Sequence, residues 1–420
     1  MGWPPRAPRL ALESKSANSF PMQPLFNPLS PEFIGDPYPF YHRLRTAAPF
    51  YRSPIGFLAL TRDRDVRSIL GDKRFGKDFL GRTTHGANSS YLQDPVIRCM
   101  GHWMLLQDPP DHTRLRGLVA KAFTARRVQE MRPRIQAIVD AALDRLAERV
   151  RADLIADFAA QIPATVICEL LGIPGEDREA FFANARSLIR LLDPVPLSRA
   201  EMELANVQNL ALSQYFNRLF DLRRRKPEDD LTSLLVLAEE QGKRLSQEEL
   251  TANVILLFAA GYDTTANLIG NGLFALFRHP DQLARLRSDG SLMGNAIEEF
   301  LRYDSPVQLT ARAALEDVTL GDIMVQKGGS IICVVGSANR DPDVYRQPDR
   351  LDIARENIRP LSFGGGIHHC LGAQLARLEA EIAISGLISR FPNLKLDDPE
   401  RPVWRPSISL RGLSSLPASL

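Results

Sequence analysis

The sequence contains little cysteine, no long uninterrupted apolar run and no marked excess of charge of either sign. Its 420 residues include four cysteines, and the formal net charge is +2. Because the cysteines are scattered and none stands in a CxxC pair, the sequence suggests neither a disulfide framework nor a zinc knuckle, and a reducing, cytoplasmic location is favoured. The near balance of charge argues against a nucleic-acid-binding protein that relies on a basic surface.

The most apolar stretch, residues 252–277, does not suit a membrane. It is interrupted by polar side chains that are costly to place in lipid, namely Asn253, Asp263, Thr264, Asn267 and Asn271. We therefore expect a buried helix of a large soluble protein, without a membrane anchor. The first residues, 1–25, are rich in proline, serine and charge and lack the apolar segment of a signal peptide, which predicts a loosely ordered tail.

Helical patterning dominates the rest of the chain. In residues 126–150, apolar side chains recur every three or four positions, which predicts an amphipathic helix with a buried stripe formed by Ile135, Val139, Leu143, Leu146 and Val150. Ser246 and Glu249 form a capping-box pattern that predicts the start of a long helix. That helix should end near Arg278, because His279-Pro280 follows. Another helix is expected between Cys370 and Pro392.

Strand signals are few and short. Residues 56–60, 317–328 and 330–336 are rich in β-branched side chains and are bounded by turn residues. No internal repeat and no long low-complexity linker divides the chain. The sequence therefore predicts a mainly helical protein with a small sheet component.

The segment FGGGIHHCLG, residues 363–372, gathers glycines, two histidines and a cysteine. A zinc site is disfavoured, because His368, His369 and Cys370 are consecutive and no second ligand cluster exists elsewhere. A buried structural thiol is the usual role of an isolated cysteine. The spacing F-x-x-G-x-x-x-C-x-G, formed by Phe363, Gly366, Cys370 and Gly372, argues against that simpler role.

A thiolate ligand for a large, flat metal cofactor accounts for this pattern. A cysteine at a helix N-terminus is stabilised as thiolate by free N–H groups and by the helix dipole. Glycines let the preceding backbone turn tightly and approach a planar ring without side-chain clashes. A haem iron with one axial sulfur has these requirements.

The segment resembles the haem-binding loop of the cytochrome P-450 superfamily, and more closely that of its soluble bacterial type. The resemblance implies haem b with Cys370 as the proximal thiolate ligand of iron. It also implies that Phe363 shields the sulfur, that His368 contacts a haem propionate, and that Gly364, Gly366 and Gly372 shape the loop. His369 is not part of the shared pattern and is expected to be a surface or packing residue.

Asp263 and Thr264 lie inside the predicted long helix. Such a pair can simply bond to the local backbone. Alternatively, the threonine loosens the helix beside the small Gly261, and the carboxylate relays protons from solvent. The resemblance favours the second role, because proteins of this type carry an acid–alcohol pair here; Asp263 and Thr264 are therefore the predicted catalytic residues.

Other basic residues are implied as haem or core residues by the same resemblance. His112 and Arg116 stand four apart on one expected helix face, and Arg312 is a third cation for the propionates. Glu299 and Arg302 stand in E-x-x-R spacing, and Arg350 about fifty residues later would complete a buried Glu–Arg–Arg arrangement with a structural role. Leu351 replaces the phenylalanine usual after that arginine.

The resemblance covers most of the chain and implies a single domain, residues 26–420. The implied fold is mainly α, of the α+β type, with small sheets. The haem would lie between the long central helix and the helix that follows Cys370. A monomer is expected.

The implied activity is that of a monooxygenase, which inserts one oxygen atom from O2 into an apolar substrate by hydroxylation or epoxidation. No flavin or iron–sulfur motif is visible, so electrons would come from NAD(P)H through a separate ferredoxin and ferredoxin reductase. Arg114, Arg126 and Arg127 could meet an acidic partner. Two alternatives remain: a peroxide-driven peroxygenase, against which the Asp263-Thr264 pair argues, and a non-catalytic haem-binding or ligand-binding protein.

The substrate pocket is expected to be mostly apolar, which favours a hydrophobic small molecule of medium to large size. The segments expected to line it are residues 82–106, with Tyr91 and Trp103, and residues 180–225. Its further lining is expected from Phe258, Ala259, Gly261, Val307, Gln308, Leu309, Ile408 and Ser409.

Overall fold

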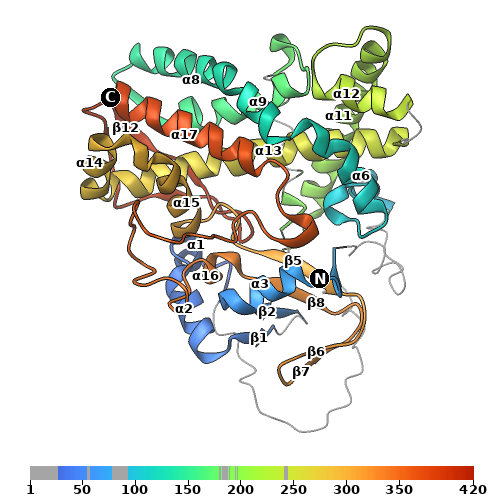
Figure 1. Ribbon diagram of the computed structural model, residues 1–420, viewed down its shortest axis with the longest axis horizontal. Coiled ribbons are helices and arrows are strands. Elements are labelled where there is room, and N and C mark those ends of the chain that lie inside the picture. Colours follow the sequence, from blue (N-terminus) through green and yellow to red (C-terminus); the bar gives the residue numbers. More distant parts are fainter. Residues whose placement is uncertain are drawn as a thin grey trace.

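The computed structural model describes residues 27–53, 57–77, 93–178, 181, 188, 190–193, 195, 197–240 and 245–420. The predicted tail, residues 1–25, lies outside these ranges, as does Tyr91. Within the described part, helices form the bulk of the molecule. The sheet that contains β1, β2, β5 and β8 lies toward one end together with β6 and β7, whereas β12 lies away from them, near α14 (Figure 1). This agrees with the mainly helical fold that the sequence predicts.

The helices are distributed along the whole described chain. Their bounds are α1 Pro31–Gly35, α2 Tyr38–Ala47, α3 Asp63–Gly71, α5 Pro95–Met100, α6 Asp111–Val119, α7 Ala125–Glu130, α8 Arg132–Ala147, α9 Gln161–Leu170, α11 Arg199–Arg225, α12 Leu231–Glu240, α13 Gln247–Phe277, α14 Pro280–Ser288, α15 Met293–Tyr303, α16 Val335–Ala338 and α17 Ala373–Arg390. Short 3-10 or π turns link them: η2 Met104–Leu106, η3 Ala120–Ala122, η4 Leu154–Ala159, η5 Gly175–Asp177, η6 Gly290–Leu292 and η7 Gly366–His368.

The long helix α13 runs through the middle of the molecule (Figure 1). Its start is the predicted capping box: the Ser246 side chain accepts from the Glu249 N–H, and the Glu249 carboxylate accepts from the Ser246 N–H. It ends at Phe277, with Arg278 as its C-cap. Both predicted boundaries are confirmed. The helix predicted after Cys370 is likewise present, as α17.

The strands form one five-stranded sheet and three smaller ones. Their bounds are β1 Phe50–Arg52, β2 Leu58–Leu60, β3 Phe75–Gly76, β4 Arg151–Asp153, β5 Thr310–Ala314, β6 Val318–Leu320, β7 Ile323–Val325, β8 Ser330–Cys333, β9 Lys395–Leu396, β10 Val403–Trp404, β11 Leu413–Ser415 and β12 Pro417–Ser419. The largest sheet has the order β1-β2-β8-β5-β3, with β2 and β8 parallel. The other sheets are β4-β12-β9, β6-β7 and β10-β11.

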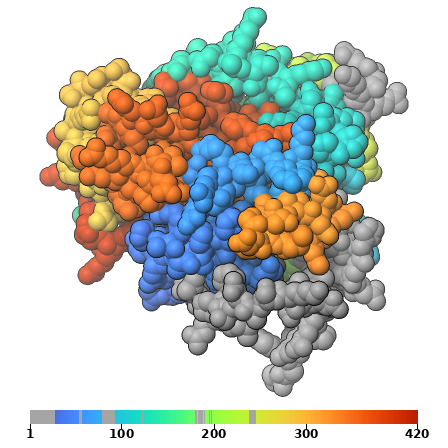
Figure 2. Space-filling model, turned by 60° about the horizontal axis from the view of Figure 1, so that its bottom comes forward, coloured from blue at the N-terminus to red at the C-terminus, as the bar shows by residue number. Residues whose placement is uncertain are grey.

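The sheets join parts of the chain that are far apart in sequence. In Figure 2 the blue N-terminal segment and the orange segment around residue 320 adjoin on one face of the molecule. The predicted strand at 317–328 is a two-stranded hairpin, β6 and β7. The predicted strand at 330–336 is too long, because β8 ends at Cys333 and α16 begins at Val335.

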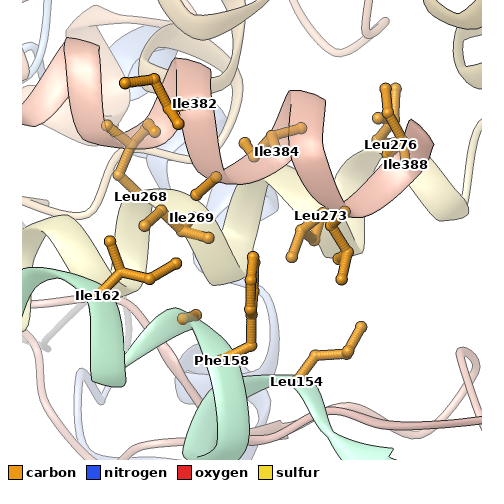
Figure 3. Close-up of a cluster of buried hydrophobic side chains, with 14 of the residues drawn as sticks. Leu154, Phe158, Ile162, Leu268, Ile269, Leu273, Leu276, Ile382, Ile384 and Ile388 are labelled. Atoms are coloured by element: carbon orange, nitrogen blue, oxygen red, sulfur yellow. The ribbon is translucent and has the colours of Figure 1, made fainter. Parts of the chain in front are cut away.

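The main hydrophobic core lies where α13 packs against α17, α9 and η4. Leucines and isoleucines of α13 and α17 face one another, and Phe158 of η4 reaches toward them (Figure 3). Four residues of the predicted amphipathic stripe, Ile135, Val139, Leu143 and Leu146, are buried in the same core. Val150 was wrongly included: α8 ends at Ala147, and the Val150 side chain is 82% exposed.

Glu299 and Arg302 form a fully buried ion pair on α15. The Arg302 Nε and Nη2 atoms lie 2.7 and 2.8 Å from the two Glu299 carboxylate oxygens. The second arginine on this carboxylate is Arg355, whose Nε lies 3.2 Å from Glu299 Oε2. The prediction of Arg350 was therefore wrong. Its side chain is exposed, and it contributes its carbonyl oxygen, which accepts from Arg302 and Arg355.

Among the described residues, no helix combines the length and the apolar character needed to cross a bilayer.

Candidate functional site

The cysteine loop lies between Leu361 and the start of α17. The Cys370 N–H donates to the Phe363 carbonyl at 2.9 Å, and the Gly364 N–H donates to the Leu361 carbonyl at 2.8 Å. These bonds close the loop around the short turn η7. Leu371, directly after Cys370, packs against the same core cluster as Ala259 and Tyr262 of α13. The loop therefore brings the sulfur to the junction of α17 and α13.

The three glycines of the loop differ in whether the backbone conformation or a close contact requires glycine. Gly366 has a φ of +63°, and a Cβ there would lie 2.2 Å from the Leu70 carbonyl oxygen at the end of α3. Gly364 also has a positive φ, +70°. Gly372 is the N-cap of α17 with a φ of −83° and has open space around it. Gly366 is thus required by the contact between the loop and α3, which the sequence did not predict.

Cys370 lies deep among protein atoms, although its side chain retains accessible surface. Burial raises the pKa of its thiol, while the Gly372 N–H and the charges of Arg116 and Arg377 act in the opposite direction. The sulfur precedes the N-cap of α17 by two residues. The helix terminus alone therefore does not make a thiolate here, whereas a coordinated metal ion deprotonates a thiol outright.

Four basic side chains converge near the loop. His112 of α6 and His368 of η7 have ring centroids 4.3 Å apart. Lys77 and Arg312 are both buried, and the register that pairs Gly76 of β3 with Ala313 of β5 places them opposite each other. The carboxylate of Asp108 accepts from the Lys77 backbone N–H at 2.7 Å.

Burial lowers the pKa of every base in this cluster, and neighbouring positive charges lower it further for Lys77, His112 and His368. Burial and the neighbouring charge of Arg312 lower the pKa of Lys77 to about 7. Burial, Lys77 and the other bases lower the pKa of His368 to about 2. The pKa of His112 is lowered by burial and by Arg116, and that of Arg312 by burial.

Such a cluster is complementary to anions. The buried Nδ1 of His112 and Nε2 of His368 have no hydrogen-bond partner among the described residues. Two carboxylates placed among these bases would satisfy both nitrogens and reverse the lowering of the pKa values. The two propionates of a haem whose iron binds Cys370 have this chemistry, so the residues present fit the group.

Arg116 and Phe363 both make contacts at the loop. An Arg116 Nη atom donates to the His369 carbonyl at 2.6 Å, so the side chain stabilises the loop directly. Phe363 is half-buried and lies under the guanidinium of Arg377, 4.5 Å from its ring centroid. The His369 side chain is exposed, as expected of a residue outside the shared pattern.

One short face of α13 is accessible. All residues from Leu250 to Leu276 are buried except Ala260, which is exposed, and Gly261 and Thr264, which are partly exposed. They are spaced i, i+1 and i+4 and therefore share one face. The Thr264 hydroxyl donates to the Ala260 carbonyl at 2.8 Å, the local backbone bond that the sequence suggested. Ile167 of α9 packs beside Gly261: its Cδ1 atom lies 3.2 Å from the position of a Cβ added to Gly261.

Asp263 is buried, and its carboxylate has a charged partner. Its carboxylate forms an ion pair with the Arg405 guanidinium, which comes from the segment between β10 and β11. No sequence motif links Arg405 to this helix. The contact therefore became visible only in the structure.

The structure separates the predicted pocket residues into two groups. Phe258 was wrongly included, because it is fully buried and packs edge-on against Phe181 at 5.3 Å. Ala259 and Trp103 are likewise buried in that core cluster. Val307, Leu309 and Ile408 are partly accessible; Leu309 and Ile408 rim the same small cluster. Residues 82–92 and parts of 180–196 lie outside the described residues.

The structure supports no other metal centre in the part of the chain it describes. No group of three or more histidine, cysteine, aspartate or glutamate side chains is placed there to bind a metal ion. The four cysteines are free thiols.

Sequence reasoning missed Lys77, Asp108 and Ala260. Lys77 and Asp108 carry no motif, and only the pairing of β3 with β5 brings Lys77 beside Arg312. Ala260 could have been found, because it lies one helical turn before Thr264.

Comparison with known proteins shows which family the chain is similar to. The family model described as "Cytochrome P450" matches residues 77–412. The chain is 43% identical to the cytochrome P450 monooxygenase PikC of Streptomyces venezuelae, over 93% of this chain and 92% of that protein. It is 42% identical to a vitamin D(3) 25-hydroxylase of Pseudonocardia autotrophica, over 92% and 94% of the two chains.

Solved structures show the same fold. P450BioI, crystallised with an acyl carrier protein ligated to hexadec-9Z-enoic acid, aligns with a TM-score of 0.87 at 38% identity, covering 93% of this chain and all of that one. A myxobacterial cytochrome P450 in complex with myristic acid aligns with a TM-score of 0.86 at 39% identity, over 93% and 98% of the chains.

Proposed function

Because the chain belongs to the cytochrome P450 family and is thereby an oxidoreductase of the haem-thiolate monooxygenase type, we propose that it oxidises an apolar organic molecule by hydroxylation or epoxidation. One atom of O2 enters the substrate. The electrons come from NAD(P)H through a separate ferredoxin and ferredoxin reductase. The observation that carries the proposal is the accessible Cys370 side chain on the same loop as His368, whose ring lies 4.3 Å from that of His112, with His368 Nε2 and His112 Nδ1 both without a hydrogen-bond partner among the described residues.

Haem binding is assigned to residues from four parts of the chain. The Cys370 sulfur would hold the iron, and His112, His368, Lys77 and Arg312 would bind the propionates. Arg116 holds the loop through the His369 carbonyl. When bound, the haem iron with its thiolate supplies the activation of dioxygen.

Proton delivery is assigned to α13. Thr264 lies on the only accessible face of the helix between Leu250 and Leu276, and its hydroxyl is already held by the Ala260 carbonyl. Asp263 is next to it in sequence and can exchange protons with water when its carboxylate is not bound to Arg405. In this assignment Thr264 orients the donor and Asp263 supplies the proton.

The electron donor is proposed to dock beside α17. Helix α7 packs against α17, and a small cavity of about 140 Å³ between them is lined by Arg132, Arg377 and neighbouring residues. Arg126 and Arg127 of α7 are exposed on this side. Arg114 is a poorer candidate than the sequence suggested, because its guanidinium is already paired with Glu249 and Asp111.

The substrate class is proposed from apolar surface and from the relatives. Val307, Leu309 and Ile408 offer partly accessible apolar side chains. Named relatives act on vitamin D(3) or are crystallised with long-chain fatty acids. A lipophilic molecule of medium to large size fits both observations.

Location and organisation complete the proposal. Four free cysteines suit a reducing cytoplasm. Strand β2 pairs with β8, and β12 pairs with β4, so both ends of the described chain are tied into shared sheets. Residues 26–420 are therefore proposed to act as one domain, and as a monomer.

The test is the optical spectrum of the purified protein, reduced and exposed to carbon monoxide. We expect a strongly red-shifted Soret band that is lost in Cys370→Ala and retained in the control Cys99→Ala. A histidine-type spectrum that survives in Cys370→Ala would contradict the proposal, as would a protein that binds no haem.

Turnover then separates the proposed reaction from its alternatives. With myristic acid as probe, NAD(P)H consumption that requires ferredoxin and reductase supports a monooxygenase. Faster turnover with hydrogen peroxide would indicate a peroxygenase. Haem binding without NAD(P)H consumption for any of a panel of apolar probes would indicate a binding protein.

A further inference from the structure

A cavity of about 340 Å³ lies where the last turns of α13 meet the end of α1 and strand β10. Its walls include Phe274 of α13, Tyr303 of α15 and Trp404 of β10. Phe274 follows Thr264 by ten residues, which corresponds to about 15 Å along a helix. The cavity is therefore separate from the accessible face of α13 at Thr264, and its volume is within the range of small-molecule sites.

Two buried arginines line this cavity, and each lies over an aromatic ring. The guanidinium carbon of Arg340 lies 3.4 Å from the ring centroid of Tyr38 and 4.1 Å from that of Tyr303. The guanidinium carbon of Arg411 lies 3.5 Å from the ring centroid of Trp404. Both arginine side chains are only 9% exposed. A guanidinium that lies over a ring keeps the N–H groups at its edge available for hydrogen bonds.

The protein does not use all the donors of these two guanidiniums. Arg340 donates through Nε and Nη2 to the Tyr303 carbonyl and through Nη1 to Asp349, whose side chain is 72% exposed. Arg411 donates through Nε to Asp304 and through Nη1 and Nη2 to two carbonyls at the end of α1. Because a guanidinium has five N–H groups, two on each arginine have no acceptor among the described residues. An added acceptor would remove the cost of leaving buried donors unpaired.

Positive charge exceeds negative charge on the wall of the cavity. Among the described residues that line it are three arginines, Arg278, Arg340 and Arg411, and two aspartates, Asp36 and Asp304. Asp36 is exposed, so the two buried arginines share the cavity wall with one buried carboxylate. A bound anion would balance this buried charge.

We propose that this cavity is a binding site for an aromatic carboxylate. The ring of the ligand packs on the aromatic wall formed by Phe274 and Trp404, whose own rings pack edge to face at 5.7 Å. The carboxylate accepts from the remaining N–H groups of Arg340 and Arg411, because a guanidinium can donate to both oxygens of a carboxylate. This ligand site is independent of the proposed function, since it involves neither Cys370 nor the bases near it.

The first test is isothermal titration calorimetry of the purified holoenzyme with naphthoate. We expect saturable binding with a dissociation constant below about 1 mM. The neutral analogue naphthylmethanol should bind at least about tenfold more weakly, because it lacks the anion. The Soret band, followed in a parallel titration, should not move. No saturable binding of naphthoate, equal affinity for the alcohol, or a Soret shift with the same midpoint would overturn the proposal.

Gly35 allows a charge to be added to the cavity wall without a clash. It lines the cavity, its carbonyl accepts from Arg411, and a Cβ there would meet no atom within 4 Å. In Gly35→Glu the new carboxylate competes with the ligand for Arg411, and we expect naphthoate to bind at least about tenfold more weakly. Gly35→Gln has the same size without the charge and should stay within about threefold of the wild type.

The control for net charge is Gly290→Glu on η6, an exposed glycine that also has open space around it, which should match the wild type. Asp36→Asn removes a carboxylate from the cavity wall and should instead tighten naphthoate binding by about threefold. An unchanged dissociation constant in Gly35→Glu shows that naphthoate binds elsewhere, and equal losses in Gly35→Glu and Gly35→Gln show that the site does not recognise the anion. Either result contradicts the proposal.

Discussion

At the scale of single residues, the bases near the cysteine loop come from distant parts of the chain: His112, His368 and Arg312, which the resemblance implied, and Lys77, which it did not. Cys370 and its glycines are close in sequence, so their spacing alone indicates a shared purpose. Lys77 and Asp108 are about thirty residues apart from each other and far from Arg312 along the chain. The buried cations of Lys77 and Arg312 meet because β3 pairs with β5, and Asp108 joins them by accepting from the Lys77 N–H.

Glu379 is a buried carboxyl that the proposed function does not use. It lies on α17, nine residues after Cys370, and its Oε2 atom has no hydrogen-bond partner among the described residues. Burial raises the pKa of this carboxyl to about 8. The folded protein therefore keeps its proton in a pH range in which the unfolded chain has released it.

The free energy of unfolding should consequently fall as pH rises from the ordinary pKa of a glutamate toward 8, by at most about 1.4 kcal/mol per pH unit from this group. Glu379→Gln removes the contribution. We expect the variant to gain about 2 kcal/mol or more over the wild type at pH 8 and to differ little near pH 4.5. Urea unfolding of both proteins between pH 4.5 and pH 8 measures this difference in the free energy of unfolding.

The matched control is Glu381→Gln, two residues further along the same helix. Glu381 is half-exposed and paired with Arg132, so its replacement should leave the pH dependence of stability nearly unchanged. A Glu379→Gln variant with the same pH dependence as the wild type would show that Glu379 is ionised or has a polar partner.

At the scale of elements, local patterns located helices better than they identified contacts. The capping box at Ser246 and the break at His279-Pro280 set the limits of α13, because both act within one turn. The predicted Glu–Arg–Arg arrangement was correct for Arg302 and wrong for Arg350. Arg302 lies one turn from Glu299, whereas the second arginine depends on the path of an irregular segment, which brings Arg355 rather than Arg350 to the carboxylate.

Arg355→Met should therefore destabilise the protein, and Arg350→Met should not. The guanidinium of Arg355 binds Glu299 and three backbone carbonyls, and its loss leaves a buried carboxylate with one cation. We expect the free energy of unfolding to fall by about 3 kcal/mol. For Arg350→Met, whose side chain is exposed, we expect a change within about 0.5 kcal/mol.

Urea unfolding of the two variants compares these values directly. Equal losses in both variants, or a larger loss in Arg350→Met, would mean that the ion pair of Arg355 with Glu299 does not form in solution.

At the scale of the whole molecule, the chain has a formal net charge of only +2, so single exposed basic residues matter for the docking of a partner. Exposed Arg126 and Arg127 lie on α7, beside the helix that follows Cys370. Their surface pairs add little stability, as the exposed pair of Arg126 with Glu130 illustrates. A charge that contributes little to stability remains available to a partner.

Reversing this charge should weaken the reaction with the electron donor. For Arg126→Glu/Arg127→Glu, we expect the ferredoxin concentration at half-maximal NAD(P)H consumption to rise about tenfold at low salt. The difference from the wild type should shrink at high salt, because salt screens exposed charges.

The control variant is Arg199→Glu on α11. Arg199 pairs with Glu203 four residues later, as Arg126 does with Glu130, but α11 packs on α5, α12 and α13. If Arg199→Glu raises the half-maximal ferredoxin concentration as much as the α7 variant does, the effect is one of net charge and the docking site is not at α7.

The sequence by itself determined the helical fold class, the limits of α13, the glycine-rich cysteine loop and the family. These depend on residues within a few turns of one another, whose spacing is preserved in any folded state. Tertiary structure alone decided which buried charges meet: Lys77 with Arg312, Arg355 with Glu299, and Arg405 with Asp263. A buried charge takes its partner from whatever the packing of distant segments brings within reach, and no local spacing encodes that choice.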